Sequence, residues 1–469
     1  MASSDNSIKI HEQCLVAPTL ATATNFSLPL TFFDMIWLRF PPVERIFFYS
    51  LPLPLSNPSF FFDKVAPRLK TSLSHTLQHF LPLAGKIIWP SDSPKPFIQF
   101  NPGDGVSFIL AQCDDDALFN HVLDNAPRES TESRTLIPHL ESSDSQASVT
   151  SLQITLFPNK GFCIGRSSHH AFLDGISLTI FFKAWAYVCK SGQEESPLPP
   201  SLDPFFGREL VKDPTALESM FINHWTQMAS LIDPSDTSNG RSVKIMSPPM
   251  EENTVRATFE LTRGDLEKIK KRVLSKWEEE ASSKPTTLST FVACCAYVSV
   301  CIVKAFHEAQ ITQKFALGFP FDCRARLDPP LPDNYFGNCV ACRIVNAQQD
   351  EFIKEDGVAI VAKKIWDTIK MFDHKGALDA VETMLPRFMA MSSEGVKVIG
   401  VAGSNRFGVY ETDFGWGRPA KVEITSIDRG LSIGFTESKD GKGGVEVGLV
   451  MNKHVMDLFH TIFNAGISD

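Results

Sequence analysis

A change of composition near the middle of this chain separates two apolar halves. Residues 191–213 are rich in proline, serine and glutamate, and residues 233–239 have the same character. The chain has 469 residues, too many for one hydrophobic core of ordinary size. We therefore expect an N-terminal domain at 1–190, a crossover linker at 191–245 and a C-terminal domain at 246–469.

Strand and helix patterns occur together in both halves. The apolar spacing predicts strands at 8–17, 86–89, 97–100, 149–157, 161–167, 256–261, 315–321, 338–344, 407–411, 421–427, 431–436 and 444–449. It predicts helices at 60–80, 216–232, 264–278, 287–307, 356–372 and 452–466, and an apolar segment at 176–188. The expected fold class is α/β, with one α/β sandwich in each half.

Composition and charge exclude several classes of partner. Hydrophobic residues make up 43% and charged residues 21%, as in ordinary globular proteins. The net charge of −9 argues against nucleic acid, whose phosphates require clustered lysines and arginines. The longest apolar segment, 288–306, contains Ser289, Ser299 and Lys304, so we expect a buried core helix and no membrane partner.

The cysteines and the first residues predict a cytoplasmic protein. The first seven residues lack the basic and then apolar pattern of a secretory signal. The ten cysteines lack paired metal spacings, and Cys294, Cys295 and Cys301 lie inside apolar runs. Reduced, buried thiols are therefore expected.

Residues 169–175, His-His-Ala-Phe-Leu-Asp-Gly, place an imidazole at the end of a predicted strand. A neutral histidine at this point could take the proton from an alcohol and activate its oxygen for attack on an acyl group. His170 is the only one of the 12 histidines with aspartate four residues later, at Asp174. The spacing alone is weak evidence, because a carboxylate that caps a structural histidine would give the same pattern.

Four further motifs accompany this segment in a fixed order. They are Leu-Thr-Phe-Phe-Asp at 30–34, Leu-Pro-Leu-Ala-Gly at 81–85, Asp-Cys-Arg-Ala-Arg at 322–326 running into Tyr-Phe-Gly-Asn-Cys at 335–339, and Asp-Phe-Gly-Trp-Gly at 413–417. Together the motifs resemble those of the plant BAHD acyltransferases, which transfer an acyl group from coenzyme A to an alcohol or amine. The segment at 335–339 is similar to the branch that acts on anthocyanins and other phenolic glycosides. The resemblance implies two similarly folded, chloramphenicol-acetyltransferase-like domains with a solvent channel between them.

The resemblance assigns roles to the first motif. His170 is expected to be the general base, and direct attack of the hydroxyl on the thioester then requires no covalent enzyme intermediate. Asp174 completes the catalytic motif, and we favour a structural role in which it pairs with an arginine, Arg324 or Arg326. His169 is expected to be a neighbour without a catalytic role, and no metal site is expected.

The last motif is expected to support the fold. Its two glycines around a tryptophan predict a tight turn, and in the family this segment lies away from the base. We therefore assign structural roles to Asp413, Gly415, Trp416 and Gly417.

The co-substrate implied by the resemblance is acyl-CoA, with no permanently bound cofactor. Its phosphates require cations and polar donors, and its pantetheine arm requires an apolar slot. The best candidates flank the predicted helix at 287–307 or precede the last motif: Lys284, Thr290, Ser404 and Arg406.

The acyl group and the acceptor are harder to predict. A malonyl carboxylate requires a cation, and members of this branch usually carry one at positions that correspond here to the apolar Ile176 and Leu178. Arg166, four residues before His170, could replace it, so malonyl is our first choice. Thr31 and Asp34 are expected to line the acceptor side.

Several alternatives stay open. The donor could be an aromatic acyl-CoA, such as hydroxycinnamoyl-CoA, or a short aliphatic one, and the acceptor could be a non-glycoside alcohol or an amine. A non-catalytic relative is disfavoured because both catalytic motif residues and the last motif are intact. We expect a monomer that binds acyl-CoA and a phenolic glycoside.

Overall fold

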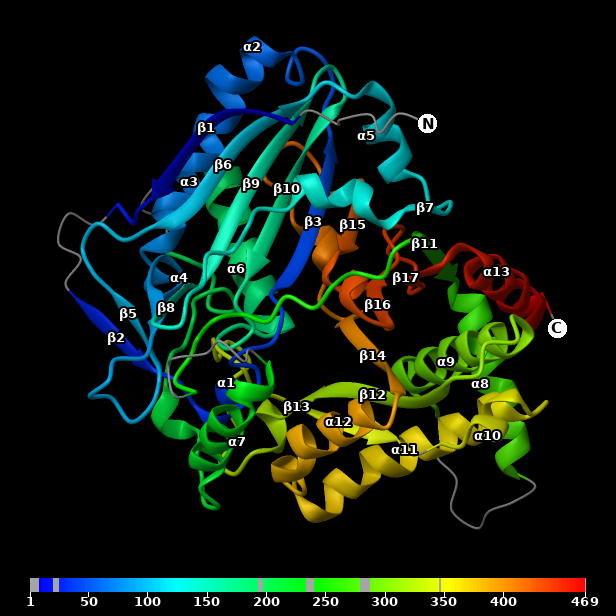
Figure 1. Ribbon diagram of the computed structural model, residues 1–469. Helices are drawn as coiled ribbons and strands as arrows, with labels where there is room; N and C mark the ends of the chain where they lie inside the picture. Colours follow the sequence, from blue (N-terminus) through cyan, green and yellow to red (C-terminus); the bar gives the residue numbers. More distant parts are fainter. Residues whose placement is uncertain are drawn as a thin grey trace.

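The computed structural model describes residues 8–19, 25–192, 197–232, 240–278, 287–345 and 347–468. Its mixed sheets and helices form two halves, which confirms the predicted α/β class (Figure 1). The N-terminal half contains a long, strongly twisted sheet, and the C-terminal half contains a second large sheet.

The N-terminal half is built on a six-stranded mixed sheet. The parallel pair β6–β9 lies inside otherwise antiparallel neighbours. The strands, in spatial order, are β1 (Ile8–Val16), β6 (Val106–Cys113), β9 (Thr150–Phe157), β10 (Gly161–Ser168), β3 (Val43–Ser50) and β15 (Lys421–Ile424).

Both faces of this sheet are covered by helices. One face packs on α3 (Ala66–Leu77) and α6 (Gly175–Ser191), and the other packs on α5 (Asp116–Leu123) and a 3₁₀ segment at Ser130–Leu136. Every residue of β9 and β10 is therefore buried. A smaller antiparallel sheet adds to the first core through β2 (Phe26–Pro29), β5 (Phe97–Phe100), β4 (Lys86–Ile88) and β8 (Gln146–Ser148).

The C-terminal half contains a seven-stranded mixed sheet. In spatial order it comprises β13 (Val340–Val345), β12 (Lys314–Asp322), β14 (Val396–Ser404), β16 (Ser432–Glu437), β17 (Val445–Asn452), β11 (Thr254–Leu261) and β7 (Arg128–Glu129). Its core is formed with α8 (Arg263–Glu278), α9 (Thr290–Glu308), α11 (Gly357–Lys375) and α13 (Lys453–Ser468). The remaining helices are α1 (Phe32–Met35), α2 (Pro58–Phe60), α4 (Leu81–Ala84), α7 (Leu217–Ile232), α10 (Gln349–Ile353) and α12 (Met384–Ser393).

The two halves exchange strands. β15 comes from the C-terminal half of the sequence but pairs with β3, and β7 comes from the N-terminal half but pairs with β11. In Figure 1 the orange β15 lies beside the blue β3. The sheets therefore cross the expected boundary between 1–190 and 246–469. The segment 191–245, expected to be the linker, contains the helix α7.

A cluster of buried charges joins the halves at this exchange. Arg128 of β7 forms a 2.6 Å ion pair with Glu423 of β15, and both side chains are almost fully buried. Nearby, Asp428 binds Arg256 and Arg134. Burial alone would raise the pKa of Glu423, but Arg128 and Lys421 outweigh this effect and lower the pKa to about 2.

Most predicted elements are present, with two kinds of difference. Residues 407–411 were expected to form a strand but contain a 3₁₀ turn at Val409–Glu411, which begins after the left-handed Gly408. Six strands, β2, β3, β6, β7, β8 and β14, were not predicted. In β3 the burial pattern is nearly continuous, and a strand buried on both faces loses the polar alternation by which strands are recognised.

The long apolar helix predicted near residue 290 is α9. By length and composition it could cross a membrane, but 78% of its most apolar window is buried inside the molecule.

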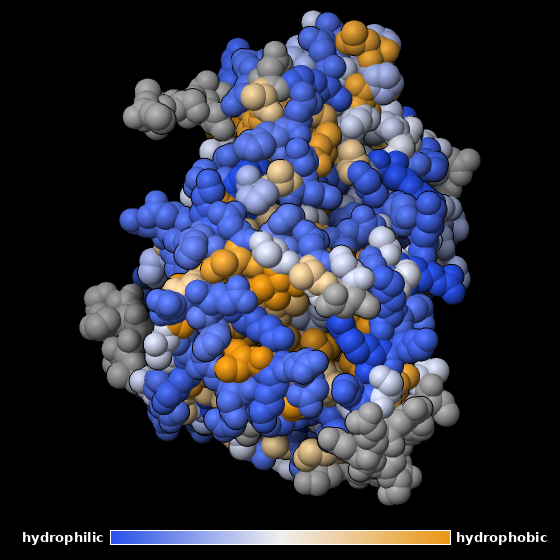
Figure 2. All heavy atoms as spheres, turned by 90° about the vertical axis from the view of Figure 1, so that its right-hand side faces the viewer, coloured by the Kyte–Doolittle hydropathy of each residue, from blue (hydrophilic) through white to orange (hydrophobic). Residues whose placement is uncertain are grey.

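All ten cysteines of the chain are free thiols. The face drawn in Figure 2 is mostly hydrophilic, with smaller hydrophobic patches between charged side chains.

Candidate active site

His170 lies immediately beyond β10, in the short loop that leads into α6. Its imidazole stacks on the indole of Trp37, with ring centroids 4.1 Å apart and an interplanar angle of 4°. Trp37 follows α1 and is 8% exposed. The indole thus fixes the plane of the imidazole from a segment far away in the sequence.

Burial keeps this imidazole neutral. Loss of hydration lowers the pKa of His170 to about 4, and the nearby Asp174 offsets the effect only in part. Nδ1 of His170 is buried and has no hydrogen-bond partner among the described residues. A neutral histidine with this environment is able to accept a proton at physiological pH.

Asp174 points away from His170 and into a hydrogen-bonded cluster. One carboxylate oxygen, Oδ2, lies 2.8 Å from Nη2 of Arg324 and accepts the Cys339 N–H at 3.1 Å. The other oxygen, Oδ1, accepts the Ser177 N–H at 2.9 Å and so caps α6. These contacts support the structural role, and Arg324 rather than the exposed Arg326 is the partner.

The side chain of His169 makes a hydrogen bond with the backbone of its own loop. Its side chain is fully buried, and its Nδ1 accepts the N–H of Ala171 at 3.1 Å. Burial lowers the pKa of His169 to about 4 as well. Its ring helps to shape the loop that carries His170.

Thr31 and Asp34 differ from the expectation that they line the acceptor side. Asp34 is 0% exposed, and its Oδ2 accepts hydrogen bonds from the backbone N–H and the hydroxyl of Thr31 at 2.8 and 3.0 Å. Its Oδ1 accepts hydrogen bonds from Asn338. Both oxygens of the carboxylate thus accept hydrogen bonds from the protein itself. The reciprocal cap between Thr31 and Asp34 begins the short helix α1.

The segment 335–339 packs directly against the loop of His170. Phe336 contacts the ring of Phe172 at 5.7 Å between centroids, and the Tyr335 hydroxyl accepts a hydrogen bond from the buried Arg208. Gly337 has φ +153°, and a side chain at this position would collide with the guanidinium of Arg208. Only glycine allows this close approach.

Residues 413–417 form a turn at the far end of α6. The Oδ1 atom of Asp413 accepts the N–H groups of Gly415 and Gly417 at 2.8 and 2.9 Å, and its Oδ2 pairs with Lys190 of α6 at 2.7 Å. Both glycines have positive φ, +104° and +106°. Trp416 lies under the guanidinium of Arg68 from α3, so this turn fastens the C-terminal half to α3 and α6.

Arg166 lies on the sheet face that packs against α6, and it has a second arginine beside it. It is 1% exposed, pairs in register with Arg45 of β3 and lies over the ring of Phe182. Its Nη1 donates to the Ser168 hydroxyl at 3.1 Å, which directs the guanidinium toward the His170 end of the strand. Among the described residues, no carboxylate lies within ion-pair distance of either arginine.

The charge of this arginine pair is poorly compensated. Burial lowers the pKa of Arg166 well below its usual value, and the like charge of Arg45 adds to the effect. Burial also lowers the pKa of Arg45 to about 10, which Glu437 partly offsets from a longer distance. Buried cations without partners are costly, so they are often completed by a ligand.

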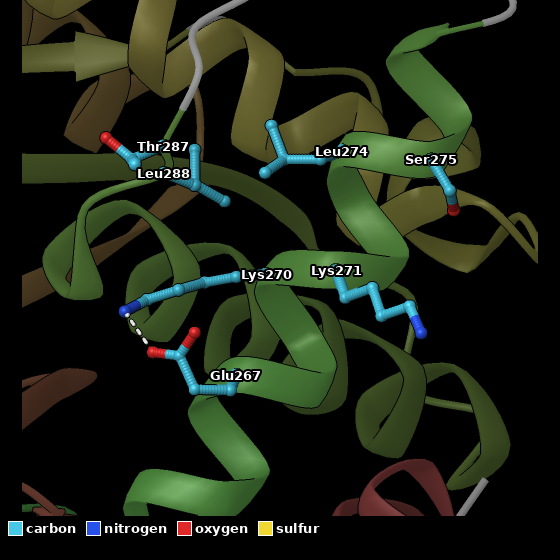
Figure 3. A pocket seen from close by; sticks show the side chains of 7 residues that line it. All are labelled: Glu267, Lys270, Lys271, Leu274, Ser275, Thr287 and Leu288. Atoms are coloured by element: carbon cyan, nitrogen blue, oxygen red, sulfur yellow. Dashed lines mark hydrogen bonds and ion pairs between the residues drawn. The ribbon is translucent and has the colours of Figure 1, made fainter.

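The residues expected to bind coenzyme A lie in two places, and Lys284 falls outside the described residues. Thr290 begins α9 beside a surface pocket of about 530 Å³ between α8 and the segment before α9. In Figure 3, Leu274 and Leu288 point toward each other in this pocket, while Lys270 pairs with Glu267 at 3.0 Å and Lys271 extends outward.

Ser404 and Arg406 lie in the second place, at the end of β14. The Ser404 hydroxyl accepts the backbone N–H of Arg406 at 3.2 Å, and the Arg406 side chain is exposed. The next residue, Phe407, packs on Gly175 at the start of α6, where any side chain would collide with its ring. This loop therefore connects the C-terminal half with the His170 loop.

Sequence reasoning missed Trp37 and Arg45. Trp37 stands three residues after the motif that ends at Asp34, but nothing in its spacing indicates a contact with His170. Arg45 lies inside an unpredicted strand. Within the described part of the chain, no group of three or more histidine, cysteine, aspartate or glutamate side chains could hold a metal ion.

Comparison with known proteins places this site in a family. The family model described as the Transferase family matches residues 6–465. A phenolic glucoside malonyltransferase from Arabidopsis thaliana is 41% identical over 475 residues, with 99% of each chain covered. The chain belongs to the BAHD acyltransferases. It is therefore an acyl-CoA-dependent acyltransferase, as the motifs predicted.

Further relatives agree with this assignment, and solved structures share the fold. This BAHD acyltransferase is 38% identical to a malonyl-CoA:anthocyanidin 5-O-glucoside-6''-O-malonyltransferase and 35% identical to an agmatine coumaroyltransferase, both from Arabidopsis thaliana, with 97–100% of each chain covered. Vinorine synthase shares its fold with a TM-score of 0.65 at 20% identity, covering 96% of both chains. The Fusarium sporotrichioides TRI101 complex with coenzyme A and T-2 gives a TM-score of 0.66 at 14% identity, covering 93% of this chain and 97% of that one.

Proposed function

We propose that this BAHD acyltransferase transfers a malonyl group from malonyl-CoA to a sugar hydroxyl of a phenolic glycoside. The observation that carries the proposal is the neutral, partly buried imidazole of His170 at the end of the strand that holds the buried, unpaired Arg166. Such an arrangement provides a base for the acceptor and a cation for a donor with a free carboxylate. The full-length similarity to enzymes named as malonyltransferases supports the same choice.

In the proposed reaction His170 removes the proton from the acceptor hydroxyl. The oxygen attacks the thioester carbonyl, the carbon–sulfur bond breaks in the resulting tetrahedral intermediate, and the thiolate of coenzyme A takes the proton from His170. The product is an ester, and no acyl-enzyme is formed. The stack on Trp37 holds the imidazole plane while the proton is accepted and returned.

A row of aromatic side chains supports a phenolic acceptor. Phe388 of α12 is 39% exposed and lies 6.0 Å from Phe40, which lies edge-on to Trp37 at 5.2 Å between ring centroids. The row thus leads from the surface to the ring on which His170 stacks. Aromatic faces and edges bind flat phenolic rings well. In addition, Nε1 of Trp37 is buried without a described hydrogen-bond partner, so it is a donor that a bound acceptor could use.

Arg166 and Arg45 support a donor with a carboxylate. Ser168, to which Arg166 donates, is two residues before His170, about 7 Å along a strand. A malonyl carboxylate close to the base could reach this pair. Its charge would compensate two cations that the described residues leave unpaired.

The pocket between α8 and the segment before α9 supports coenzyme A binding at the protein surface. Lys270, Lys271, Ser275 and Thr287 offer cations and hydroxyls for phosphate groups. Thr290 and Ser404 stay candidates for direct contact, together with Arg406. The cytoplasmic location and the monomeric state stay predictions.

The proposal is tested with a matrix of donors and acceptors, read by the mass of the product. Malonyl-CoA, acetyl-CoA and p-coumaroyl-CoA are each combined with a phenolic glucoside, its aglycone and agmatine. We expect a mass increase of one malonyl group on the glucoside only. Coumaroyl transfer to agmatine, or efficient transfer of acetyl in place of malonyl, would contradict the proposed substrates.

The role of the base is tested separately. His170→Ala is expected to lower turnover by about 10²- to 10⁴-fold, the usual effect of removing a positioned general base, while the melting temperature stays close to that of the parent. Near-normal turnover of the folded variant would disprove the mechanism.

A further inference from the structure

Asn338 connects a buried carboxylate with the backbone of His170. Its Nδ2 donates to the carbonyl oxygen of His170 at 2.7 Å and to Oδ1 of Asp34 at 3.1 Å. Its backbone N–H donates to the same Asp34 oxygen at 3.2 Å. Asn338 is 0% exposed, and 304 residues separate it from Asp34 in the sequence.

The chemistry of these partners fixes the orientation of the amide. The His170 carbonyl and the Asp34 carboxylate only accept hydrogen bonds, so the amide nitrogen, not the oxygen, must face them. Asp34 is itself held by the two donors of Thr31, and Nη1 of Arg208 lies 3.7 Å from its Oδ2. Burial raises the pKa of Asp34, and Arg208 and the donors on Thr31 and Asn338 oppose this effect, so the connection starts from a carboxyl group held by several donors.

The next residue of the segment holds the other end of the same loop. The Cys339 N–H donates to Oδ2 of Asp174 at 3.1 Å, while Arg324 pairs with this oxygen and also donates to the Gly337 carbonyl at 3.0 Å. The loop from His170 to Asp174 is thus attached at its first residue through Asn338 and at its last residue through Cys339.

We propose that the segment 335–339 positions the catalytic base and does not contact the acceptor. Asn338 is the positioning residue, because its hydrogen bonds link the anchored Asp34 to the backbone of His170. This inference rests on the proposed role of His170 as the base. It deepens that role, because it gives the segment a function in the rate of reaction and not in the choice of substrate.

The substitution Asn338→Ala tests the proposal through kcat, KM and the pH profile. A misplacement of about 1 Å at a reacting group costs about 10²-fold, so we expect kcat to fall by about that factor. The KM values for malonyl-CoA and for the glucoside should stay within about twofold, because no substrate contact is lost. The loosened loop should also admit water to the imidazole, so the acid limb of the kcat profile should move upward.

Asn334→Ala is the matched control. Asn334 lies just before the segment, and its Nδ2 also donates to a backbone carbonyl, that of Asp203, at 2.8 Å. The control removes the same kind of hydrogen bond without touching the His170 loop, so its kcat and pH profile should equal those of the parent.

Two further variants cover the case in which Asn338→Ala folds poorly. Asn338→Ser keeps a small polar side chain, and Asp34→Asn breaks the connection from its other end. Donors surround both carboxylate oxygens of Asp34, so one end of an amide there must oppose a donor. Both variants should show the same fall in kcat and the same shift of the acid limb.

Other outcomes overturn the proposal. A rise in the acceptor KM at unchanged kcat would mean that the segment contacts the acceptor, and parent-like kinetics of Asn338→Ala would mean that the connection has no catalytic effect. If His170→Ala itself retains turnover, the proposed base is wrong, which is a different failure.

Discussion

The rings of His170 and Trp37 lie parallel, with an interplanar angle of 4° and 4.1 Å between their centroids. The two residues come from the end of β10 and from the segment after α1, which the fold brings together. The base of the proposed reaction thus owes its orientation to an aromatic surface on another segment.

Trp37→Leu should lower kcat without unfolding the protein. The stack is lost, the imidazole can rotate, and misplacement of a reacting group costs about 10²-fold in rate. Trp37→Phe retains an aromatic face and should keep most of the activity. Steady-state kinetics with a melting curve check this prediction, and equal losses in both variants would contradict a role of the stack.

The activity should persist to unusually low pH for a histidine base. Burial lowers the pKa of His170 to about 4 from the usual 6.5, and the base must be neutral to act. The acid limb of the kcat/KM profile is therefore expected near pH 4. A His169→Asn variant should keep this limb, since we expect no catalytic role for His169, and a limb near 6.5 in the parent would contradict the buried environment.

Asp174→Asn should reduce both activity and stability. The side chain keeps its shape, but Arg324 loses its buried carboxylate partner and retains only the partly exposed Asp322, and breaking a buried pair costs up to about 3–5 kcal/mol. The melting temperature should fall clearly, whereas Asp367→Asn, in the exposed pair with Lys363, should change little. A large loss of activity at an unchanged melting temperature would move Asp174 into the catalytic machinery.

Arg166→Leu should discriminate between donors. If Arg166 binds the malonyl carboxylate, its removal should raise the KM for malonyl-CoA by at least about 10²-fold, because loss of one partner from a buried charge pair costs about 3–5 kcal/mol. Acetyl-CoA has no such carboxylate and should be used as well as before or better. Equal effects on both donors would make Arg166 structural. The exposed Arg326→Leu serves as the matched control.

Glu423→Gln should weaken the contact between the halves. The free energy of unfolding should fall by about 3–5 kcal/mol, because Arg128 would stay buried without its anion. The folded-state pKa of Glu423, about 2, lies below the ordinary 4.5, so its stabilisation is present above pH 4.5 and is lost as the pH falls toward 2. The parent should therefore lose more stability over this range than the variant, as denaturant titrations at several pH values would reveal.

Much of the local structure was predictable from the sequence. The hairpin of β4 and β5 and the pair β9–β10 form where the apolar patterns and turn residues placed them. The turn at Asp413 was also predictable, because its two glycines adopt the positive φ that other residues avoid. The proposal of His170 as the base came from one histidine, its aspartate and the order of the distant motifs.

Most partners of these residues could not be predicted, although Arg324 was one of the two candidates for Asp174. Asp34 was expected at the acceptor side, yet it is fully buried and anchors Asn338. Its sequence context shows the helix cap with Thr31 but contains no trace of a residue 304 positions away. The exchange of β15 and β7 between the sheets could not be predicted either, because each strand pairs with a partner that is far away in the sequence.

The sequence by itself determined the chemical groups and the local elements, because apolar periodicity, turn residues and motif order are encoded over short distances. Only the tertiary structure decided that Asp174 faces Arg324, that Trp37 stacks on the imidazole of His170 and that Arg45 lies beside Arg166. Each of these contacts joins residues from separate segments, and the packing of the segments selects which side chains meet. Burial then sets the pKa of His170, since hydration is lost only when the whole core has formed.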